Sequence, residues 1–262
     1  MKLSRDATVV FILTSGIIAL PPFARGGCLD LSEQLATEYL QNIGCKSVIY
    51  QPDGNVPPDF VVDDGIGVEV RRLNQNEITD SGYRGLEETS VPLLMKIKRL
   101  LNSFGPPDSG TRWFVSYTFR RPLSWKGLKG PLRDALTTFR NSRIESCYAT
   151  VTISDTFDID LIRATNAHSH FFVLGGYSDS DSGGWVLSEA LRNLRICIRE
   201  KSRKITRARD RYNEWWLILI DYIGYGAYDC DRSTFRKHLA LEHDWNRIFL
   251  VNPIKPTVAF EL

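Results

Sequence analysis

One short segment, residues 59–73, constrains the fold more than any other part of this chain. Two β-prone runs in it flank the three residues Asp63-Asp64-Gly65. That sequence suits a three-residue hairpin loop with the glycine in the left-handed conformation, so the two aspartates are interpreted as turn residues. The loop length fixes the register of the hairpin. Each residue before the loop then faces the residue that lies equally far after it. Asp59 is therefore predicted to lie opposite Glu69.

The predicted hairpin has one apolar face and one charged face, because side chains alternate along a strand. The apolar face, which is expected to be core, carries Phe60, Val62, Ile66, Val68 and Val70. The other face carries Asp59, Glu69 and Arg71. Two carboxylates directly opposite each other, with β-carbons about 5 Å apart, destabilise a sheet unless positive charge offsets them. The sequence therefore predicts that a cation is bound between the two carboxylates.

Asp59 and Glu69 supply the oxygen ligands that Mg²⁺ and Mn²⁺ prefer, and water and phosphate oxygens usually complete the shell of these ions. Such an ion activates water and neutralises the charge that develops on a phosphodiester. Arg71 is placed on the same face to contact the phosphate or the developing charge. A second interpretation stays open, in which Asp59 is a strand-entry residue and Glu69 forms an ion pair with Arg71 or Arg72 on a solvated face.

Sequence patterns around the hairpin predict the order helix, three strands, helix, strand for the first half of the chain. These elements are a helix at Leu31–Ile43 that ends before Gly44, a strand at Ser47–Tyr50, the two hairpin strands, a helix at Pro92–Asn102 and a strand at Thr111–Thr118. Farther on, the patterns predict helices at 132–141 and 186–212 and strands at 148–153, 170–174, 215–220 and 247–251. Together they indicate one mixed α/β body over residues 28–262, with its core motif at 30–120 and an elaboration at 121–262.

Pro58-Asp59 followed by Glu69-Val70-Arg71 resembles the signature of the PD-(D/E)XK nuclease superfamily. The predicted order of elements is similar to the αβββαβ core of that superfamily, which has a mixed central sheet flanked by helices. The resemblance implies a restriction-endonuclease-like fold and metal-dependent cleavage of nucleic acid, usually DNA. Arg71 departs from the signature, because the family has lysine at this position.

The resemblance also implies further site residues. The family often adds an acidic residue from the first helix, where Glu33 is preferred to Glu38 because it lies near the helix start; a first-turn glutamate facing the helix dipole is the alternative. The guanidinium of Arg71 keeps its charge at all relevant pH values, so it stabilises a transition state but does not transfer a proton. Some members carry the lysine on the following helix, where Lys96 and Lys98 are candidates, with solvated helix charges as the alternative.

Basic residues are dense between positions 191 and 211, where arginines recur at helical spacing and indicate a stripe that follows phosphates. A solvated amphipathic helix is the alternative explanation. The net charge of the whole chain is only +2, so affinity for a polyanion must come from local clusters. Contacts to nucleic acid are assigned to Arg72, Lys96, Lys98, Arg195, Arg199 and Arg203.

Two classes of function are consistent with these features. The first is a Mg²⁺- or Mn²⁺-dependent endonuclease with DNA as the expected substrate, Asp59 and Glu69 as metal ligands, and Arg71 and Glu33 as further catalytic residues. The second is a catalytically degenerate protein of the same fold that binds nucleic acid or protein. Arg71 distinguishes the two classes, since it replaces the lysine on which the catalysis of the family depends.

The cysteine pattern and the N-terminus bear on localisation. The five cysteines are scattered, odd in number and without zinc-ligand spacing, which favours reduced thiols and a cytoplasmic protein. Residues 1–27 form an apolar extension with three open interpretations: a signal or membrane anchor, an appendage, or residues upstream of the true start of the domain. Export or anchoring through residues 7–24 is thus the alternative to a cytoplasmic location.

Overall fold

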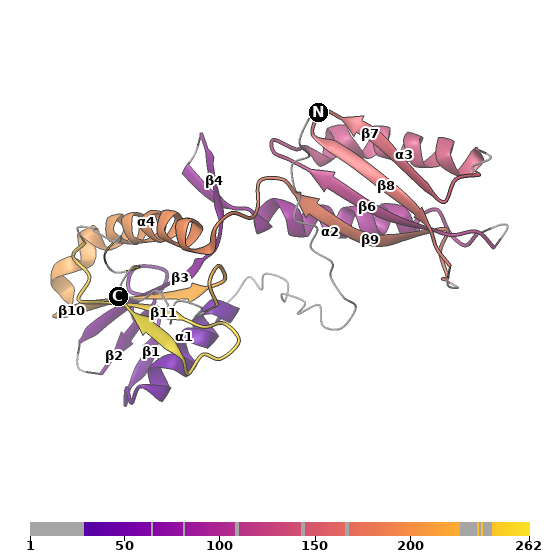
Figure 1. The fold of residues 1–262 in the computed structure, drawn as a ribbon. Helices are drawn as coiled ribbons and strands as arrows, with labels where there is room; N and C mark the ends of the chain where they lie inside the picture. The colour runs from indigo at the N-terminus through magenta and orange to yellow at the C-terminus, as the bar shows by residue number, and fades with distance from the viewer. Residues whose placement is uncertain are drawn as a thin grey trace. The chain divides into compact units, whose positions relative to one another are not determined.

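The computed structural model describes residues 29–63, 65–80, 82–107, 110–142, 145–165, 168–225, 235, 237 and 243–262 (Figure 1). These residues form two compact units. The inserted unit comprises Leu86–Gly183, and the flanking unit comprises the described residues up to Gly85 together with those from Gly184 to Leu262. The sequence patterns had indicated one body over residues 28–262. The predicted extension at residues 1–27 lies outside the described residues.

The flanking unit is built on a six-stranded mixed sheet with the strand order β1-β2-β3-β10-β11-β12. The strands are β1 (Val48–Tyr50), β2 (Phe60–Val62), β3 (Ile66–Leu73), β10 (Glu214–Asp221), β11 (Arg247–Val251) and β12 (Ala259–Glu261). The first three strands pair antiparallel, β3, β10 and β11 run parallel, and β12 pairs antiparallel with β11. The predicted α/β class is thus confirmed, and β12 had not been predicted.

Two helices cover the opposite faces of this sheet (Figure 1). Helix α1 (Leu31–Asn42) packs Ala36 and Leu40 on one face, and α4 (Val186–Ile205) packs Leu194 and Ile198 on the other. Strand β10 lies between them and is buried along seven of its eight residues. Its continuous apolar run follows from this position, because both of its faces contact helices. A short 3₁₀ helix, η1 (Thr206–Arg211), follows α4.

Helix α1 begins and ends where the sequence predicts. The Asp30 carboxylate accepts a hydrogen bond from the Glu33 backbone N–H at 2.9 Å, and the Glu33 carboxylate accepts one from the Asp30 N–H at 2.7 Å. This reciprocal capping box satisfies two backbone donors that the first turn leaves unpaired. At the other end, Ile43 is the C-cap and Gly44 has a φ of +94°, a conformation that favours glycine.

The inserted unit has its own four-stranded sheet, in the order β7-β8-β6-β9. Its elements are α2 (Glu87–Asn102), β6 (Trp113–Phe119), α3 (Trp125–Asn141), β7 (Tyr148–Ser154), β8 (Phe157–Arg163) and β9 (Phe172–Asp179). Both helices pack on one face, where every second residue of β6 is buried. A separate two-stranded hairpin, β4 (Asn76–Thr79) with β5 (Gly82–Gly85), belongs to the flanking unit. Neither this hairpin nor β8 had been predicted.

One prediction about the core is wrong. The helix at Pro92–Asn102 and the strand at Thr111–Thr118 exist, as parts of α2 and β6, but β6 does not join the sheet of the hairpin. Strand β10 lies beside β3 instead, and α4 is the helix that precedes it. The physical reason is the burial pattern, because the alternation of β6 suits a sheet covered on one face, whereas the apolar run of β10 suits a sheet covered on both.

A buried ion pair joins the two ends of the inserted unit. The guanidinium of Arg121 donates to both carboxylate oxygens of Asp179, at 2.7 and 2.8 Å, and to the carbonyl oxygen of Leu86 at 2.7 Å. The backbone N–H of Arg121 also donates to the Asp181 carboxylate at 2.7 Å. The Arg121 and Asp179 side chains are only 6% and 5% exposed. Because Leu86 begins the unit and Asp179 lies close to its end, one guanidinium holds both ends together.

The described residues bear in two ways on the predictions about localisation. Among them, no helix combines the length and the apolar character needed to cross a bilayer. The thiols of Cys45, Cys147 and Cys197 form no disulfide, while Cys28 and Cys230 lie outside the described residues.

We expect Arg121→Ala to destabilise the inserted unit by about 3–5 kcal/mol, because the substitution leaves the Asp179 carboxylate buried without its partner. Urea unfolding followed by tryptophan fluorescence measures the effect. Arg120→Ala is the matched control, since Arg120 is exposed and its side chain donates a hydrogen bond to the Asp155 carbonyl oxygen at 2.7 Å. The free energy of unfolding of Arg120→Ala is expected to stay within about 0.5 kcal/mol of the wild-type value. Equal losses in the two variants would contradict the role given to Arg121.

Candidate active site

The hairpin has the predicted register. Phe60 pairs with Val68 and Val62 with Ile66, so Asp59, one residue before β2, faces the Glu69 side of β3. Gly65 has a φ of +118°, as expected of glycine in the turn, and Asp64 lies outside the described residues. The turn chemistry and the two-residue alternation therefore place the two acidic residues on neighbouring strands.

The Asp59 and Glu69 carboxylates converge on two lysines from α4. The ammonium of Lys201 donates to Asp59 Oδ2 at 3.0 Å and to Glu69 Oε2 at 2.5 Å. The ammonium of Lys204 donates to Asp59 Oδ1 at 3.1 Å and to Glu69 Oε2 at 3.0 Å. Asp59 also accepts a hydrogen bond from the backbone N–H of Val70 at 2.8 Å. In this structure the ammonium groups of the two lysines thus offset the charge of the opposed carboxylates.

The four side chains differ in their access to solvent. The Glu69 side chain is fully buried, those of Lys201 and Asp59 are 11% and 17% exposed, and that of Lys204 is 42% exposed. Lys201 is therefore an inner residue of the cluster and Lys204 lies at its rim. The two lysines are three residues apart, so they lie about 60° apart around the helix axis and point toward the same side.

The surroundings of Asp59 and Glu69 shift the pKa values of their carboxyl groups in opposite directions. Burial alone raises the pKa of Asp59, but Lys201, the Val70 N–H and Lys204 outweigh it, and the resulting pKa is lowered. Burial is also the largest influence on Glu69, and there it prevails with the help of the Asp59 charge, so that the pKa is raised. Two carboxylates with divergent proton affinities are typical of acid–base sites.

Asp59 and Glu69 are the residues of this cluster that could hold a divalent cation. Glu69 Oε1 is buried and has no hydrogen-bond partner among the described residues. An unpaired buried carboxylate oxygen is costly, and a cation would satisfy it. Within the same part of the chain, no group of three or more His, Cys, Asp or Glu residues is arranged to hold a metal ion. Two carboxylates suffice for Mg²⁺ when water and phosphate oxygens fill the remaining positions, so Asp59 and Glu69 fit this ion.

Arg71 and Glu33, which were also predicted to be catalytic, have other partners. Arg71 lies on the same face of β3 as Glu69 but forms an ion pair with Glu200 of α4. Glu33 completes the capping box of α1 and accepts a hydrogen bond from the Tyr50 hydroxyl at 3.0 Å. Burial is the main cause of a raised Glu33 pKa, and the charge of Asp59 contributes to it. Glu33 is thus an electrostatic neighbour of the cluster with a structural role of its own.

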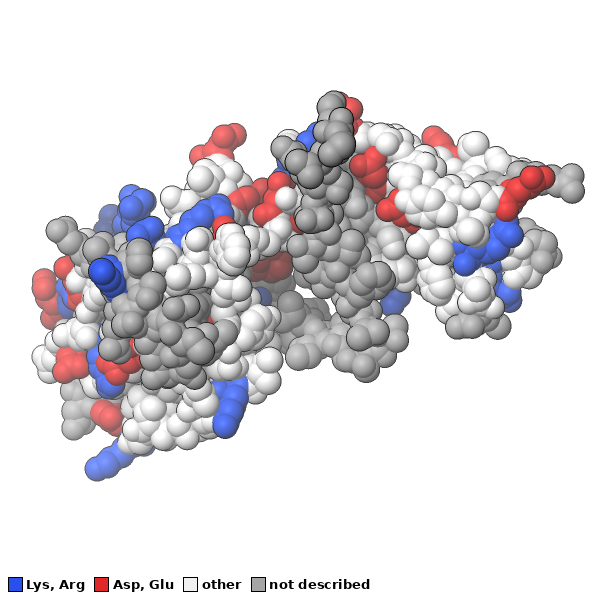
Figure 2. Space-filling model, viewed as in Figure 1, with Lys and Arg blue, Asp and Glu red and all other residues white. Residues whose placement is uncertain are grey.

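The residues predicted to contact nucleic acid do not join the cluster. Arg72 points to the α1 face of the sheet, where its Nε donates to the Ser32 hydroxyl at 2.9 Å. Lys96 and Lys98 are exposed on α2, in the inserted unit. The arginines of α4 point away from the cluster, about 120–160° around the helix axis from Lys201. Those predicted to contact nucleic acid are Arg195, Arg199 and Arg203, all exposed, and Figure 2 shows basic side chains at the surface over α4.

Lys201 and Lys204 had not been singled out in the sequence. The signal that marks Lys201 is its position on the apolar face of α4, about 20° from Leu194 and 40° from Ile205. A lysine among core residues of a helix requires a buried anionic partner, because an unpaired ammonium is costly to bury.

Comparisons of this chain with models of known protein families, with curated proteins and with solved structures find no match.

We expect Asp59→Asn and Glu69→Gln to change the pH dependence of stability in opposite directions. Folding lowers the pKa of Asp59, so the wild type should lose stability relative to Asp59→Asn as the pH falls below the ordinary value of 3.8. Folding raises the pKa of Glu69, so the wild type should gain stability relative to Glu69→Gln as the pH falls through the raised pKa toward the ordinary value of 4.5. Urea unfolding in a chelator between about pH 3 and 7 measures both effects, and shifts of the same sign would contradict the assignment.

Proposed function

We propose that this protein is a metal-dependent nuclease of the PD-(D/E)XK class that hydrolyses phosphodiester bonds in nucleic acid, with DNA as the expected substrate. The observation that carries the proposal is the convergence of the Asp59 and Glu69 carboxylates on the ammonium of Lys201, at 3.0 and 2.5 Å. Two acidic residues and one lysine are the set that the signature of the class supplies. Here the lysine comes from α4 instead of from position 71.

The order of elements in the flanking unit supports the same class. Helix α1, strands β1 to β3, helix α4 and strand β10 occur in the order αβββαβ, with the β4–β5 hairpin and the inserted unit between β3 and α4. This order supports the proposal, because it is similar to the αβββαβ order expected of the class. The basic region at residues 191–211, interpreted in the sequence as a phosphate-binding stripe, supplies the lysines of the site in this arrangement.

Each residue of the cluster has a distinct role in the proposed reaction. Asp59 and Glu69 would hold Mg²⁺ or Mn²⁺, which when bound lowers the pKa of a coordinated water and neutralises charge on the phosphate. The ammonium of Lys201 would donate to a phosphoryl oxygen or orient the attacking water. Arg71 is held by Glu200 and contributes positive charge beside the cluster. The low exposure of Glu69 and Lys201 strengthens these interactions by excluding solvent.

We expect the purified chain to cleave DNA in the presence of Mg²⁺ or Mn²⁺. Asp59→Asn and Glu69→Gln should abolish cleavage because they remove metal ligands. Lys201→Met should lower the rate by about a hundredfold or more, the usual cost of losing a charge-stabilising donor. Lys255→Met is the matched control, since Lys255 is exposed and lies outside the cluster. Gel assays with labelled duplex DNA, single-stranded DNA and RNA measure the rates.

If none of the three substrates is cleaved with either metal, the proposal that this protein is an enzyme is rejected.

One observation favours the second candidate function, a non-catalytic binding protein with this fold. The two ammonium groups balance the charge of the two carboxylates, so the cluster is electrically satisfied as an internal ion-pair network. Binding of the same nucleic acids without cleavage would support that candidate.

Metal binding distinguishes the two candidates directly. A divalent ion must compete with Lys204 for Asp59 Oδ1 and Glu69 Oε2, the oxygens that this rim lysine contacts. We therefore expect Lys204→Met to bind Mn²⁺ more tightly than the wild type and Glu69→Gln to lose Mn²⁺ binding. Calorimetric titration measures both, with Lys255→Met as the control. If neither the wild type nor Lys204→Met binds Mn²⁺, the cluster is a structural ion-pair network.

A further inference from the structure

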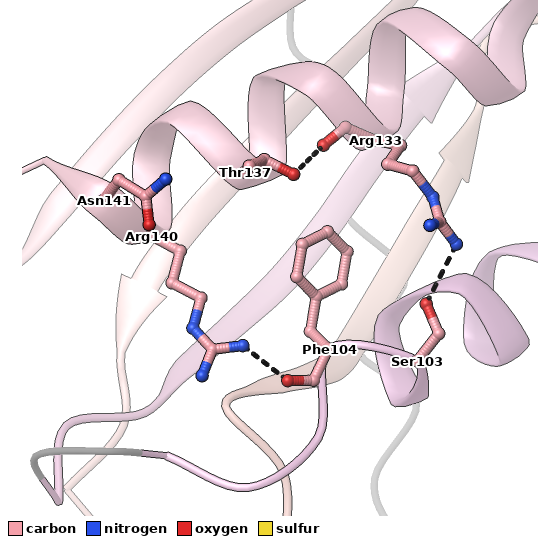
Figure 3. Close-up of a pocket in the computed structure, with 6 residues that line it drawn as sticks. All are labelled: Ser103, Phe104, Arg133, Thr137, Arg140 and Asn141. Atoms are coloured by element: carbon pink, nitrogen blue, oxygen red, sulfur yellow. Dashed lines mark hydrogen bonds between the residues drawn. The ribbon is translucent and has the colours of Figure 1, made fainter.

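A surface cavity of about 410 Å³ opens in the inserted unit beside the C-terminal ends of α2 and α3 (Figure 3). It is lined by Ser103, Phe104, Arg133, Thr137, Arg140 and Asn141. The lining contains two guanidinium groups, two hydroxyls and a carboxamide, and it contains no carboxylate. This composition fits an anionic ligand, because every charged group in the lining is positive.

Helix α3 aligns the polar groups of the cavity. Arg133, Thr137 and Arg140 follow one another at intervals of four and three residues, so they lie on one face of the helix. The two arginines are about 10 Å apart along the helix axis. Figure 3 shows the Phe104 ring between the two arginine side chains, with both guanidinium groups on the same side of α3.

The arginines are held in place by neighbouring groups. Arg140 donates to the Phe104 carbonyl oxygen at 2.5 Å, and its guanidinium lies over the Phe171 ring, 5.0 Å from the centroid. Arg133 donates from Nη2 to the Ser103 hydroxyl at 3.3 Å. Its side chain is exposed, and this hydrogen bond uses one of the five N–H donors of a guanidinium. Preorganised arginines lose little entropy when a ligand binds.

We propose that this cavity binds a backbone phosphate of a nucleic-acid strand, an inference that rests on the proposed function. The planar guanidinium fork matches a phosphate, and serine, threonine and asparagine side chains are common phosphate donors. Arg133, Thr137 and Asn141 are exposed, so the cavity is open at the surface. An open site suits a polymer that continues beyond it better than a small anion that must be enclosed. The site positions the strand and reads no base, since phosphate contacts carry no sequence information.

The test uses the full chain and a labelled 20-base-pair duplex in a chelator, so that binding is measured without cleavage. Anisotropy titrations at several salt concentrations give the slope of log K against log salt. Removing one phosphate contact should reduce the magnitude of this slope by about one. Arg133→Gln is expected to show that reduction, and Thr137→Lys, which adds a charge between the arginines, is expected to show the opposite change.

Lys255→Gln in the flanking unit is the charge-matched control and should leave the slope unchanged if the site is specific. An unchanged slope in both Arg133→Gln and Thr137→Lys would overturn the proposal, as would a wild type that does not bind the duplex. Titration with inorganic phosphate separates the two sources of phosphate. If Arg133→Gln weakens phosphate binding and not duplex binding, the site is for a free anion and the proposal fails.

The same measurements separate this inference from the proposed function. If duplex binding depends on Arg133 but the protein never cleaves nucleic acid, the proposed phosphate site is supported and the proposed nuclease function is rejected. If Arg133→Gln changes neither the rate of cleavage nor the salt slope of binding, the proposed nuclease function is supported and the proposed phosphate site is rejected. Circular dichroism of each variant verifies that the fold is retained.

Discussion

The opposition of two carboxylates on adjacent strands is the constraint on which the flanking unit depends. Asp59 and Glu69 face each other because a short turn fixes the hairpin register, and Glu69 is fully buried. A buried carboxylate must be compensated, so the ammonium of Lys201 is required at one position above β3. That requirement fixes the rotation of α4 about its axis. Through its apolar face, α4 then covers β10, which completes the centre of the sheet.

The parts of this arrangement that the sequence could predict are those with local causes. The hairpin register follows from a turn and a two-residue alternation, and α1 follows from Asp30, Glu33 and Gly44 at its ends. The lysines of the site could not be predicted in the same way, because Lys201 is separated from Glu69 by 132 positions. The choice of β10 over β6 as the neighbour of β3 is equally non-local. The only sequence feature that indicated the pairing of β10 with β3 is that β10 is apolar on both faces.

The placement of lysine on a helix changes what the site depends on. A strand-borne lysine at position 71 would be fixed by the same ladder that fixes Glu69. The ammonium of Lys201 is fixed by the packing of α4, including Cys197 one turn earlier, whose thiol contacts the Arg72 carbonyl oxygen at 3.6 Å. A small shift of α4 along the sheet would separate the ammonium from both carboxylates. The electrostatics of the site are thus coupled to the apolar contacts beneath the helix.

The buried ion pair between Arg121 and Asp179 affects how the chain reaches its native topology. Strand β3 must pair with β10 across a separation that includes the whole inserted unit, and closing so long a loop is entropically costly. Because the guanidinium brings Leu86 and Asp179 to one point, a folded inserted unit presents its two ends as a short connection. The effective contact order of the central parallel pairing falls accordingly. Early folding of the inserted unit would therefore accelerate assembly of the sheet that carries the carboxylates.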